Sequence, residues 1–275
     1  MRTSIAILVA SLGSACGGPQ ATAARADAID PPALLLEVGA STTELLRAPE
    51  QSIEALDAAR GEARGPDRRR VLRDLARAHL VAAEGAEDRE ARRHRRSAER
   101  FAENAAQGSR DSTFNAEMAF VQIWLAWRGG AASASGRAER FTTRFAEATS
   151  LAPIVWMIRG EIAFESQRWD EAATAFRFVL GQLGHPLYAY ALYRTAACLA
   201  QQGREEDSRQ ALREVAQLGC DAGAPASTMQ VALRAATELG AGARTDPEGV
   251  TRPASCPEET SSAAEGEERP PALSD

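Results

Sequence analysis

Apolar residues recur at steps of three and four along the chain, from about residue 32 to residue 240. This spacing places them on one face of an α-helix. Between residues 86 and 107 that face consists of Ala91, His94, Ala98, Phe101 and Ala105, and arginines cover the other sides. The stretch 118–127 is apolar nearly all round, which predicts a buried central helix. It is too short for a membrane-spanning helix, which needs ~20 residues.

Glycine, proline and serine interrupt this pattern and divide it into separate helices. Gly108, Gly203 and Gly219 stand where a helix C-terminus is expected. Nowhere do Val, Ile and Thr alternate in the way that predicts a strand. We therefore expect an all-α fold, with helices at 32–47, 50–63, 67–84, 86–107, 112–128, 136–149, 153–167, 169–183, 187–202, 204–218 and 226–239.

The composition supports a helical protein. Alanine makes up about a fifth of the chain, aromatic residues make up 5%, and all 32 basic residues are arginine. Alanine, leucine and arginine favour helices, and the residues that favour strands are sparse. This excludes a large β-sandwich or barrel. The 44% of hydrophobic residues suffice for a sizeable core.

The negative charge is concentrated at the C-terminus. The net charge is −6, and residues 244–275 alone hold 3 arginines against 8 acidic residues. The nearly neutral body offers no general basic field, so we expect no nucleic-acid partner. Residues 241–275 are rich in Pro, Gly, Ser and Glu and have few large apolar side chains. We predict a disordered acidic tail there.

The N-terminus has the order of an export signal. A short basic start precedes an apolar run at 5–12 and small residues before Cys16, which is typical of a secretory signal peptide. The segment 1–15 resembles a bacterial lipoprotein signal, which implies that Cys16 is lipidated. Gly13 departs from the leucine usual in that motif, so plain secretion stays an alternative. Gly17 after the cysteine favours the outer membrane, by resemblance to Gram-negative sorting rules.

Small residues recur twelve positions apart, each near the middle of one helix of a pair. Gly160 and Ala172 form one such pair, and Ala196 and Ser208 form another. Two helices cross closely only where no large side chain intervenes, so this spacing predicts paired antiparallel helices.

The segment 153–218 resembles the tetratricopeptide repeat. Its matching positions are Trp156, Gly160, Trp169, Ala172 and Phe176 in one unit, and Ala196, Ser208 and Leu212 in the next. The resemblance implies antiparallel helix pairs in a right-handed superhelix, an α-solenoid, and it extends more weakly over 67–240. A flexible spacer at 16–31 and N-terminal helices at 32–66 would precede this domain.

In this family the first helix of each pair lines a groove that binds peptides or partner helices. The resemblance implies nine groove-facing residues, namely Phe120, Ile123, Trp127, Met157, Glu161, Glu165, Tyr190, Tyr193 and Gln201. Exposed Trp, Tyr and Met side chains are typical anchors of interfaces. In the alternative interpretation, most of these side chains fill the contacts between adjacent repeats.

Motifs for catalysis and cofactor binding are missing. The three histidines, His79, His94 and His185, have no metal-ligand spacing, and no phosphate loop or nucleophile elbow occurs. His94 stands on an apolar face, which predicts a packed core residue. We expect no enzyme activity, no cofactor, no metal site and no small-molecule substrate.

The cysteines suggest a disulfide, and a cluster of arginines suggests a basic surface. An exported protein permits disulfides, and Cys220 could pair with Cys256 and pin the tail to the last repeat. Cys198 lies mid-helix and is expected in the core. Residues 66–110 hold 12 arginines against 8 acidic residues. This stretch is either a solvated face or a surface for anionic lipid headgroups or an acidic partner.

These features favour a non-catalytic scaffold, lipid-anchored in the outer membrane and facing the periplasm, that binds proteins of a cell-envelope complex. An alternative is a periplasmic accessory protein or regulator of cell-wall or polysaccharide processing. A secreted enzyme without a recognisable motif is a lower alternative.

Overall fold

The computed structural model describes residues 48–146, 150–221, 223–245 and 249–256. The signal peptide with Cys16, the spacer, the helix expected at 32–47 and the end of the tail lie outside the described residues. The described part folds into ten helices and one short β-hairpin. The helices are α3 (Pro49–Glu62), α4 (Gly65–Gly85), α5 (Asp88–Ala106), α6 (Ser112–Arg128), α7 (Ser133–Arg144), α8 (Ala152–Glu165), α9 (Trp169–Leu180), α10 (Tyr188–Gln201), α11 (Glu205–Leu218) and α12 (Ala226–Glu238).

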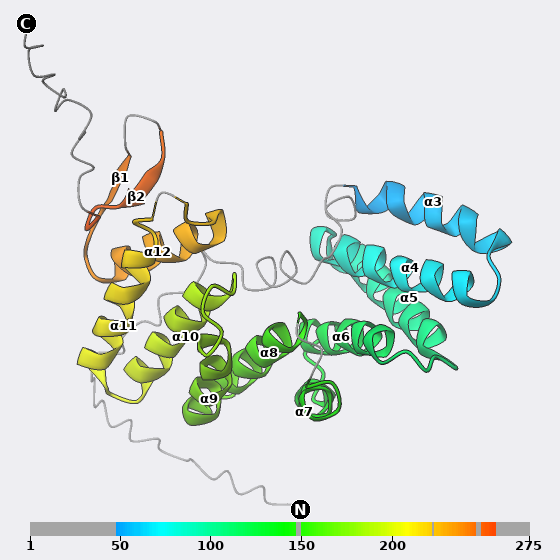
Figure 1. The fold of residues 1–275 in the computed structure, drawn as a ribbon, viewed down its shortest axis with the longest axis horizontal. Coiled ribbons are helices and arrows are strands. Elements are labelled where there is room, and N and C mark those ends of the chain that lie inside the picture. The colour runs from blue at the N-terminus through cyan, green and yellow to red at the C-terminus, as the bar shows by residue number, and fades with distance from the viewer. Residues whose placement is uncertain (1–47, 147–149, 222, 246–248, 257–275) are drawn as a thin grey trace, which may run out of the picture.

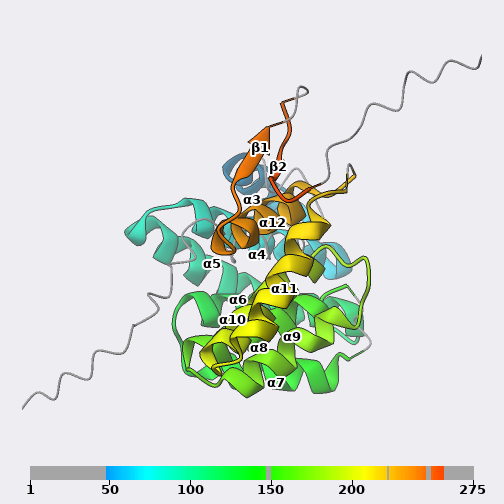
Figure 2. The same ribbon diagram turned by 90° about the vertical axis from the view of Figure 1, so that its left-hand side faces the viewer.

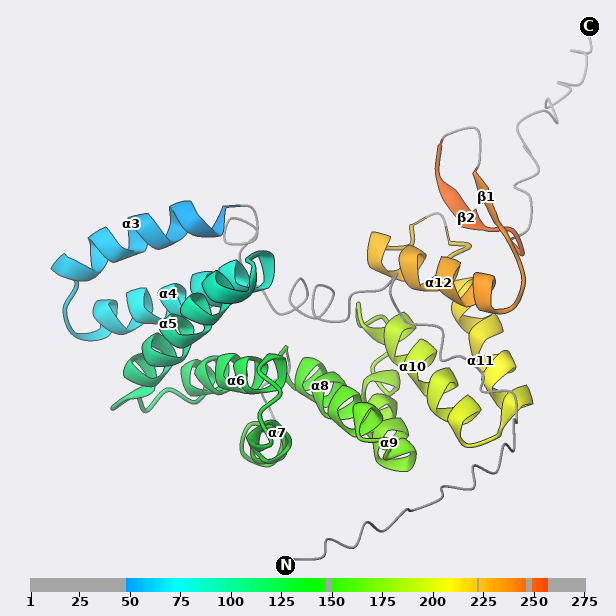
Figure 3. The same cartoon turned by 180° about the vertical axis from the view of Figure 1, so that it is seen from behind.

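The helices follow one another along an arc, and each packs against its neighbours in sequence (Figure 1). In the middle of the arc, α6, α8 and α10 lie toward the inside, and α7, α9 and α11 lie toward the outside (Figures 1 and 3). Seen from the end of the arc, the successive helices stack behind one another (Figure 2). The fold is an all-α array of helix pairs, as the sequence predicted.

The small residues lie at the helix crossings that their spacing predicted. Gly160 on α8 faces Phe176 on α9, and a Cβ at this glycine would lie 2.2 Å from Cε1 of the ring. Ala172, Ala196 and Ser208 are buried as well. Leu212 is also buried, while Trp156 and Trp169 are half-buried. Trp156 stacks on Phe178, with 4.9 Å between the ring centroids.

Most predicted helices agree with the structure to within two or three residues, and α6 agrees at both ends. The largest difference is at α7, which begins three residues earlier than the expected 136 and ends at Arg144. Glycines end several helices in the predicted way. After α10, Gly203 adopts a φ of 75°, and the amide of Arg204 then donates to the carbonyl of Leu199 at 2.9 Å.

The tail prediction was wrong for its first part. Residues 243–245 (β1) and 251–253 (β2) form an antiparallel hairpin, in which Arg244 faces Arg252. Cys256, directly after it, forms a disulfide with Cys220, which stands between α11 and α12. This is the pairing that the sequence had left open. The cross-link orders a segment that is too polar to form a core of its own.

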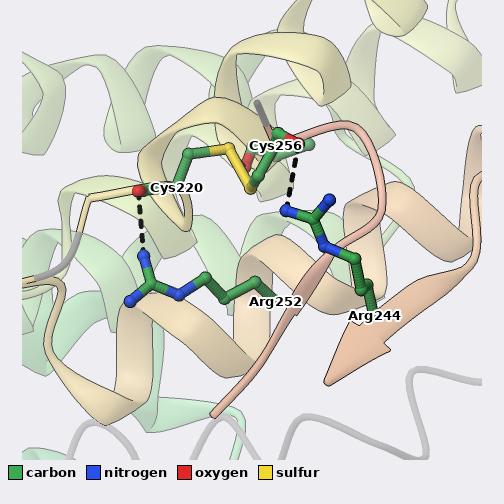
Figure 4. Close-up of a disulfide and its surroundings, with 5 residues drawn as sticks. Cys220, Arg244, Arg252 and Cys256 are labelled. Atoms are coloured by element: carbon green, nitrogen blue, oxygen red, sulfur yellow. Dashed lines mark hydrogen bonds between the residues drawn. A yellow bond between two sulfur atoms is a disulfide. The ribbon is translucent and has the colours of Figure 1, made fainter. Parts of the chain in front are cut away.

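Two arginines of the hairpin lie against the disulfide (Figure 4). Arg252 donates from Nη1 to the carbonyl of Cys220 at 3.2 Å, and Arg244 donates from Nη2 to the carbonyl of Cys256 at 3.4 Å. Pro253 of the hairpin packs against Gly219 at the end of α11, since a Cβ added at this glycine would lie 3.4 Å from the proline ring. The hairpin therefore covers the end of the helix array.

Candidate functional site

The inner helices are joined by polar contacts that recur at each step of the arc. At the first step, Glu84 at the end of α4 accepts two hydrogen bonds from α6. One comes from Nε1 of Trp124 at 3.1 Å and the other from Nε of Arg128 at 2.9 Å. Trp124 is fully buried, so its indole N–H needs this acceptor inside the protein.

At the step from α8 to α10, Glu161 is buried and holds two partners. Nε and Nη2 of Arg194 donate to its two oxygens at 2.8 and 2.6 Å, and the hydroxyl of Tyr190 donates to Oε1 at 3.0 Å. The guanidinium also lies 3.8 Å from the ring centroid of Phe164. Burial lowers the pKa of Arg194, but the charge of Glu161, the nearby Tyr190 and the hydrogen bond to Glu161 together outweigh it and hold that pKa above its ordinary value. Both oxygens of Glu161 accept hydrogen bonds from these partners, the condition under which a buried ion pair is tolerated.

At the step from α10 to α12, Tyr193 donates its hydroxyl hydrogen bond to Glu238 at 2.6 Å. Arg234 donates to the same carboxylate oxygen at 3.0 Å. Burial, together with the hydrogen bond to Glu238, raises the pKa of Tyr193 to about 12. The tyrosine is thus a neutral hydrogen-bond donor at physiological pH.

Between α6 and α8, Trp127 and Glu165 come together at a small pocket. The pocket has a volume of about 270 Å³, and Ile162 and Arg168 also line it. Burial and the nearby Glu161 raise the pKa of Glu165, and a hydrogen bond from Trp127 opposes the shift. Each step between inner helices therefore carries one carboxylate that binds an aromatic or arginine donor of the neighbouring helix.

This arrangement corrects the predicted groove. Seven of the nine expected groove residues are buried, with 9% exposure or less: Phe120, Ile123, Trp127, Met157, Glu161, Tyr190 and Tyr193. They fill the contacts between adjacent helices, as in the alternative interpretation, and are not exposed anchors. Glu165 and Gln201 alone of the nine are exposed. Successive side chains along a helix differ in direction by about 100°. An error of one residue in the register is therefore enough to move a side chain from the groove into the core.

A pair of buried histidines lies between α4 and α5. His79 and His94 approach with 2.9 Å between their Nδ1 atoms, so one must donate and the other accept. His94 is in the core, as predicted. Sequence reasoning missed its partner, although two histidines 15 residues apart in an antiparallel helix pair could have indicated it. In the described ranges no cluster of three or more His, Cys, Asp or Glu residues could hold a metal ion.

The comparison with protein families bears on the middle of the chain. A tetratricopeptide repeat model matches residues 128–182 and again residues 159–225. The stretch 128–225 matches the tetratricopeptide repeat. The matches include the units that the sequence had singled out, since α8 pairs with α9 and α10 pairs with α11. Tetratricopeptide repeats generally mediate protein–protein interaction, which supports a protein-binding role.

No curated protein and no solved structure gives a match to the chain. Among the helices that the structure describes, none combines the length and apolar character needed to cross a membrane.

Proposed function

We propose that this chain is a non-catalytic scaffold for protein–protein interaction, lipid-anchored through Cys16 in the cell envelope. The tetratricopeptide repeat match over 128–225 carries the first part of the proposal. The inner helices support it, because their polar contacts hold neighbouring repeats in fixed register. A preorganised surface loses little freedom when a partner docks.

The exposed inner residues provide the test for partner binding. Glu165 and Gln201 are exposed and lie at the C-terminal ends of α8 and α10. The variant Glu165→Arg with Gln201→Arg changes the charge of this face, and Gln201→Arg alone does so while leaving the hydrogen bond from Trp127 to Glu165 intact. A matched control is Glu205→Arg with Gln217→Arg, two exposed residues of the outer helix α11 that give the same change of charge.

The experiment is crosslinking in the native envelope, followed by purification of the full chain and mass spectrometry. We expect stoichiometric partner proteins with the original chain and the control, and their loss with the inner-face variant. Recovery of the same partners with both variants would show that they bind elsewhere. Co-sedimentation with purified cell wall in the absence of any protein partner would contradict the scaffold role.

The anchor is tested separately. Because a diacylated chain adds ~0.8 kcal/mol of membrane binding per buried methylene, Cys16→Ser should move the protein from the membrane to the soluble fraction. It should also abolish incorporation of labelled palmitate. A Cys16→Ser variant that still fractionates with membranes and still carries label contradicts lipidation at this residue.

A further inference from the structure

A hollow with arginine on both sides runs between α5 and α7, on a face that the inner-helix contacts do not use. It consists of two adjoining cavities of about 380 and 710 Å³ that share Arg137 in their linings. The floor is α6, which contributes the polar Gln122 and the apolar residues Ala119, Ile123, Leu125 and Ala126.

Both walls of this hollow carry arginines, three or four residues apart along each helix or directly adjacent. Six arginines line it, with Arg92, Arg95 and Arg96 on α5 and Arg137, Arg140 and Arg144 on α7. We call it the arginine groove. Three carboxylates, Glu99, Glu103 and Glu139, stand in the same lining. The groove therefore has a net positive charge on both walls, above a mostly apolar floor.

Within the described residues, the groove arginines form no ion pair, whereas some other arginines nearby do. Arg93 on the same helix pairs with Glu90 at 2.8 Å, and Arg128 pairs with Glu84 at 2.9 Å. None of the six groove arginines comes within 4 Å of a carboxylate in the described part of the chain. Nε of Arg95 is buried without a hydrogen-bond partner.

The dimensions of the groove favour an extended anion over a single ion. From Arg92 to Glu103, α5 advances by about 16 Å, at 1.5 Å per residue. An extended peptide covers that length with about five residues. In the polyproline II conformation, which has three residues per turn, the side chains of such a peptide point in three directions and can face both arginine walls and the floor. A lone phosphate would occupy only one end of the groove.

We propose that the arginine groove binds an acidic segment of a partner polypeptide, with Glu or Asp carboxylates on the two walls and apolar side chains on the floor. The inference rests on the proposed function, because it specifies the chemistry of one partner. It places that partner between second helices, α5 and α7, and not on the inner face. Guanidinium groups suit this role because they bind carboxylates in a two-pronged geometry.

The test uses the full-length chain in detergent and a fluorescein-labelled eight-residue peptide of glutamate and leucine. The variant Arg96→Gln with Arg140→Gln removes one exposed arginine from each wall. Its matched control is Arg89→Gln with Arg209→Gln, two exposed arginines outside the groove. Fluorescence anisotropy gives the affinity, and circular dichroism verifies that helix content is unchanged.

We expect the groove variant to bind the peptide about tenfold more weakly than the original chain, and the control to remain within about twofold. Arg95→Gln alone, which removes the charge of one guanidinium from the lining, should weaken binding in the same direction. A peptide with glutamine in place of glutamate should not bind.

Three outcomes would overturn the proposal. Equal weakening by the groove variant and the control would indicate general charge attraction. Binding of phosphatidylglycerol vesicles through the groove arginines, without peptide binding, would assign the groove to lipid headgroups. Binding of inorganic phosphate that excludes the peptide would assign it to a small anion.

The two proposals fail in different ways. If envelope partners are recovered and remain bound to the groove variant, the arginine groove is not their site and the scaffold role stands. If the peptide binds as expected but no envelope partner is recovered, the groove stands and the scaffold role fails.

Discussion

A single glycine decides how closely α8 and α9 approach. A Cβ added at Gly160 would lie 2.2 Å from Cε1 of Phe176, and that ring is fully buried with little room to move. We expect Gly160→Ala to lower the free energy of unfolding by ~1–3 kcal/mol, the usual cost of overpacking a core. Urea unfolding followed by circular dichroism measures this change.

Gly61→Ala is the matched control, since an added Cβ there meets nothing within 4 Å. Helix propensity alone should then raise stability slightly, by up to ~1 kcal/mol. If both substitutions change stability in the same direction and by the same amount, the close crossing at Gly160 is not what holds the two helices together.

The buried histidines make stability depend on pH. Burial, with a contribution from His94, lowers the pKa of His79 from 6.5 to about 4. Asp57 on α3 opposes this shift, and Arg93 and Arg100 on α5 reinforce it. His94 itself has Glu50 at 3.4 Å and Glu90 at 3.9 Å from Nε2. The unfolded chain therefore takes up a proton at His79 near pH 6.5, whereas the folded chain does so only near pH 4.

The contribution of neutral His79 to the free energy of unfolding is fully present above pH 6.5. It is lost as the pH falls from 6.5 toward 4. Between pH 7 and pH 5 the loss is about 2 kcal/mol. His79→Phe keeps a ring that can stack on Phe101, as His79 does at 5.5 Å, and should remove most of this pH dependence. Urea midpoints at the two pH values test it. An undiminished dependence in the variant would place the titrating group elsewhere.

At the scale of the element, the end of the helix array depends on a covalent link. The disulfide joins residues 36 apart and encloses α12 and the hairpin. In the chain-entropy treatment, closing a loop of this length stabilises the folded state by about 4 kcal/mol. Cys220→Ser with Cys256→Ser should lower the melting temperature and expose residues 243–256 to protease before the helices.

Cys198 provides the internal control for that experiment. It is buried and unpaired, and burial raises its pKa to about 12, so it should resist alkylation in the folded protein. Mass mapping without reductant should find Cys220 and Cys256 linked. If both thiols are free in exported protein and the melting temperature is unchanged by reductant, the link does not support the fold.

The same elements show what the sequence could predict. Helices were predictable because glycines and prolines end them and apolar positions recur along them, as in α6. The hairpin was not predictable, because its three-residue strands have no alternating pattern and depend on a cysteine 36 residues away. The groove residues were misplaced because repeat spacing fixes which positions are equivalent, but not which of them face the neighbouring helix.

At the scale of the molecule, each helix contacts mainly its neighbours in sequence, with further contacts between successive inner helices. Stability in such an array is a sum of local terms, so different regions open separately. The helix at the N-terminal end of the array buries far fewer side chains than a helix in the middle. No residue of α3 is buried, whereas nine residues of α8 are. Hydrogen–deuterium exchange should therefore be fastest in α3 and slowest in α8 and α10.

The ion pair between α8 and α10 tests whether this coupling is local. Glu161→Gln leaves the charge of Arg194 buried without its counterion, which should cost ~3–5 kcal/mol. Because the lost contacts join neighbouring inner helices, exchange should accelerate in α8–α11 and remain unchanged in α4 and α5. Glu161→Leu with Arg194→Met removes both charges and should restore much of the stability. Equal acceleration along the whole array would instead mean that the repeats unfold as one cooperative unit, and that the polar contacts act on the whole molecule.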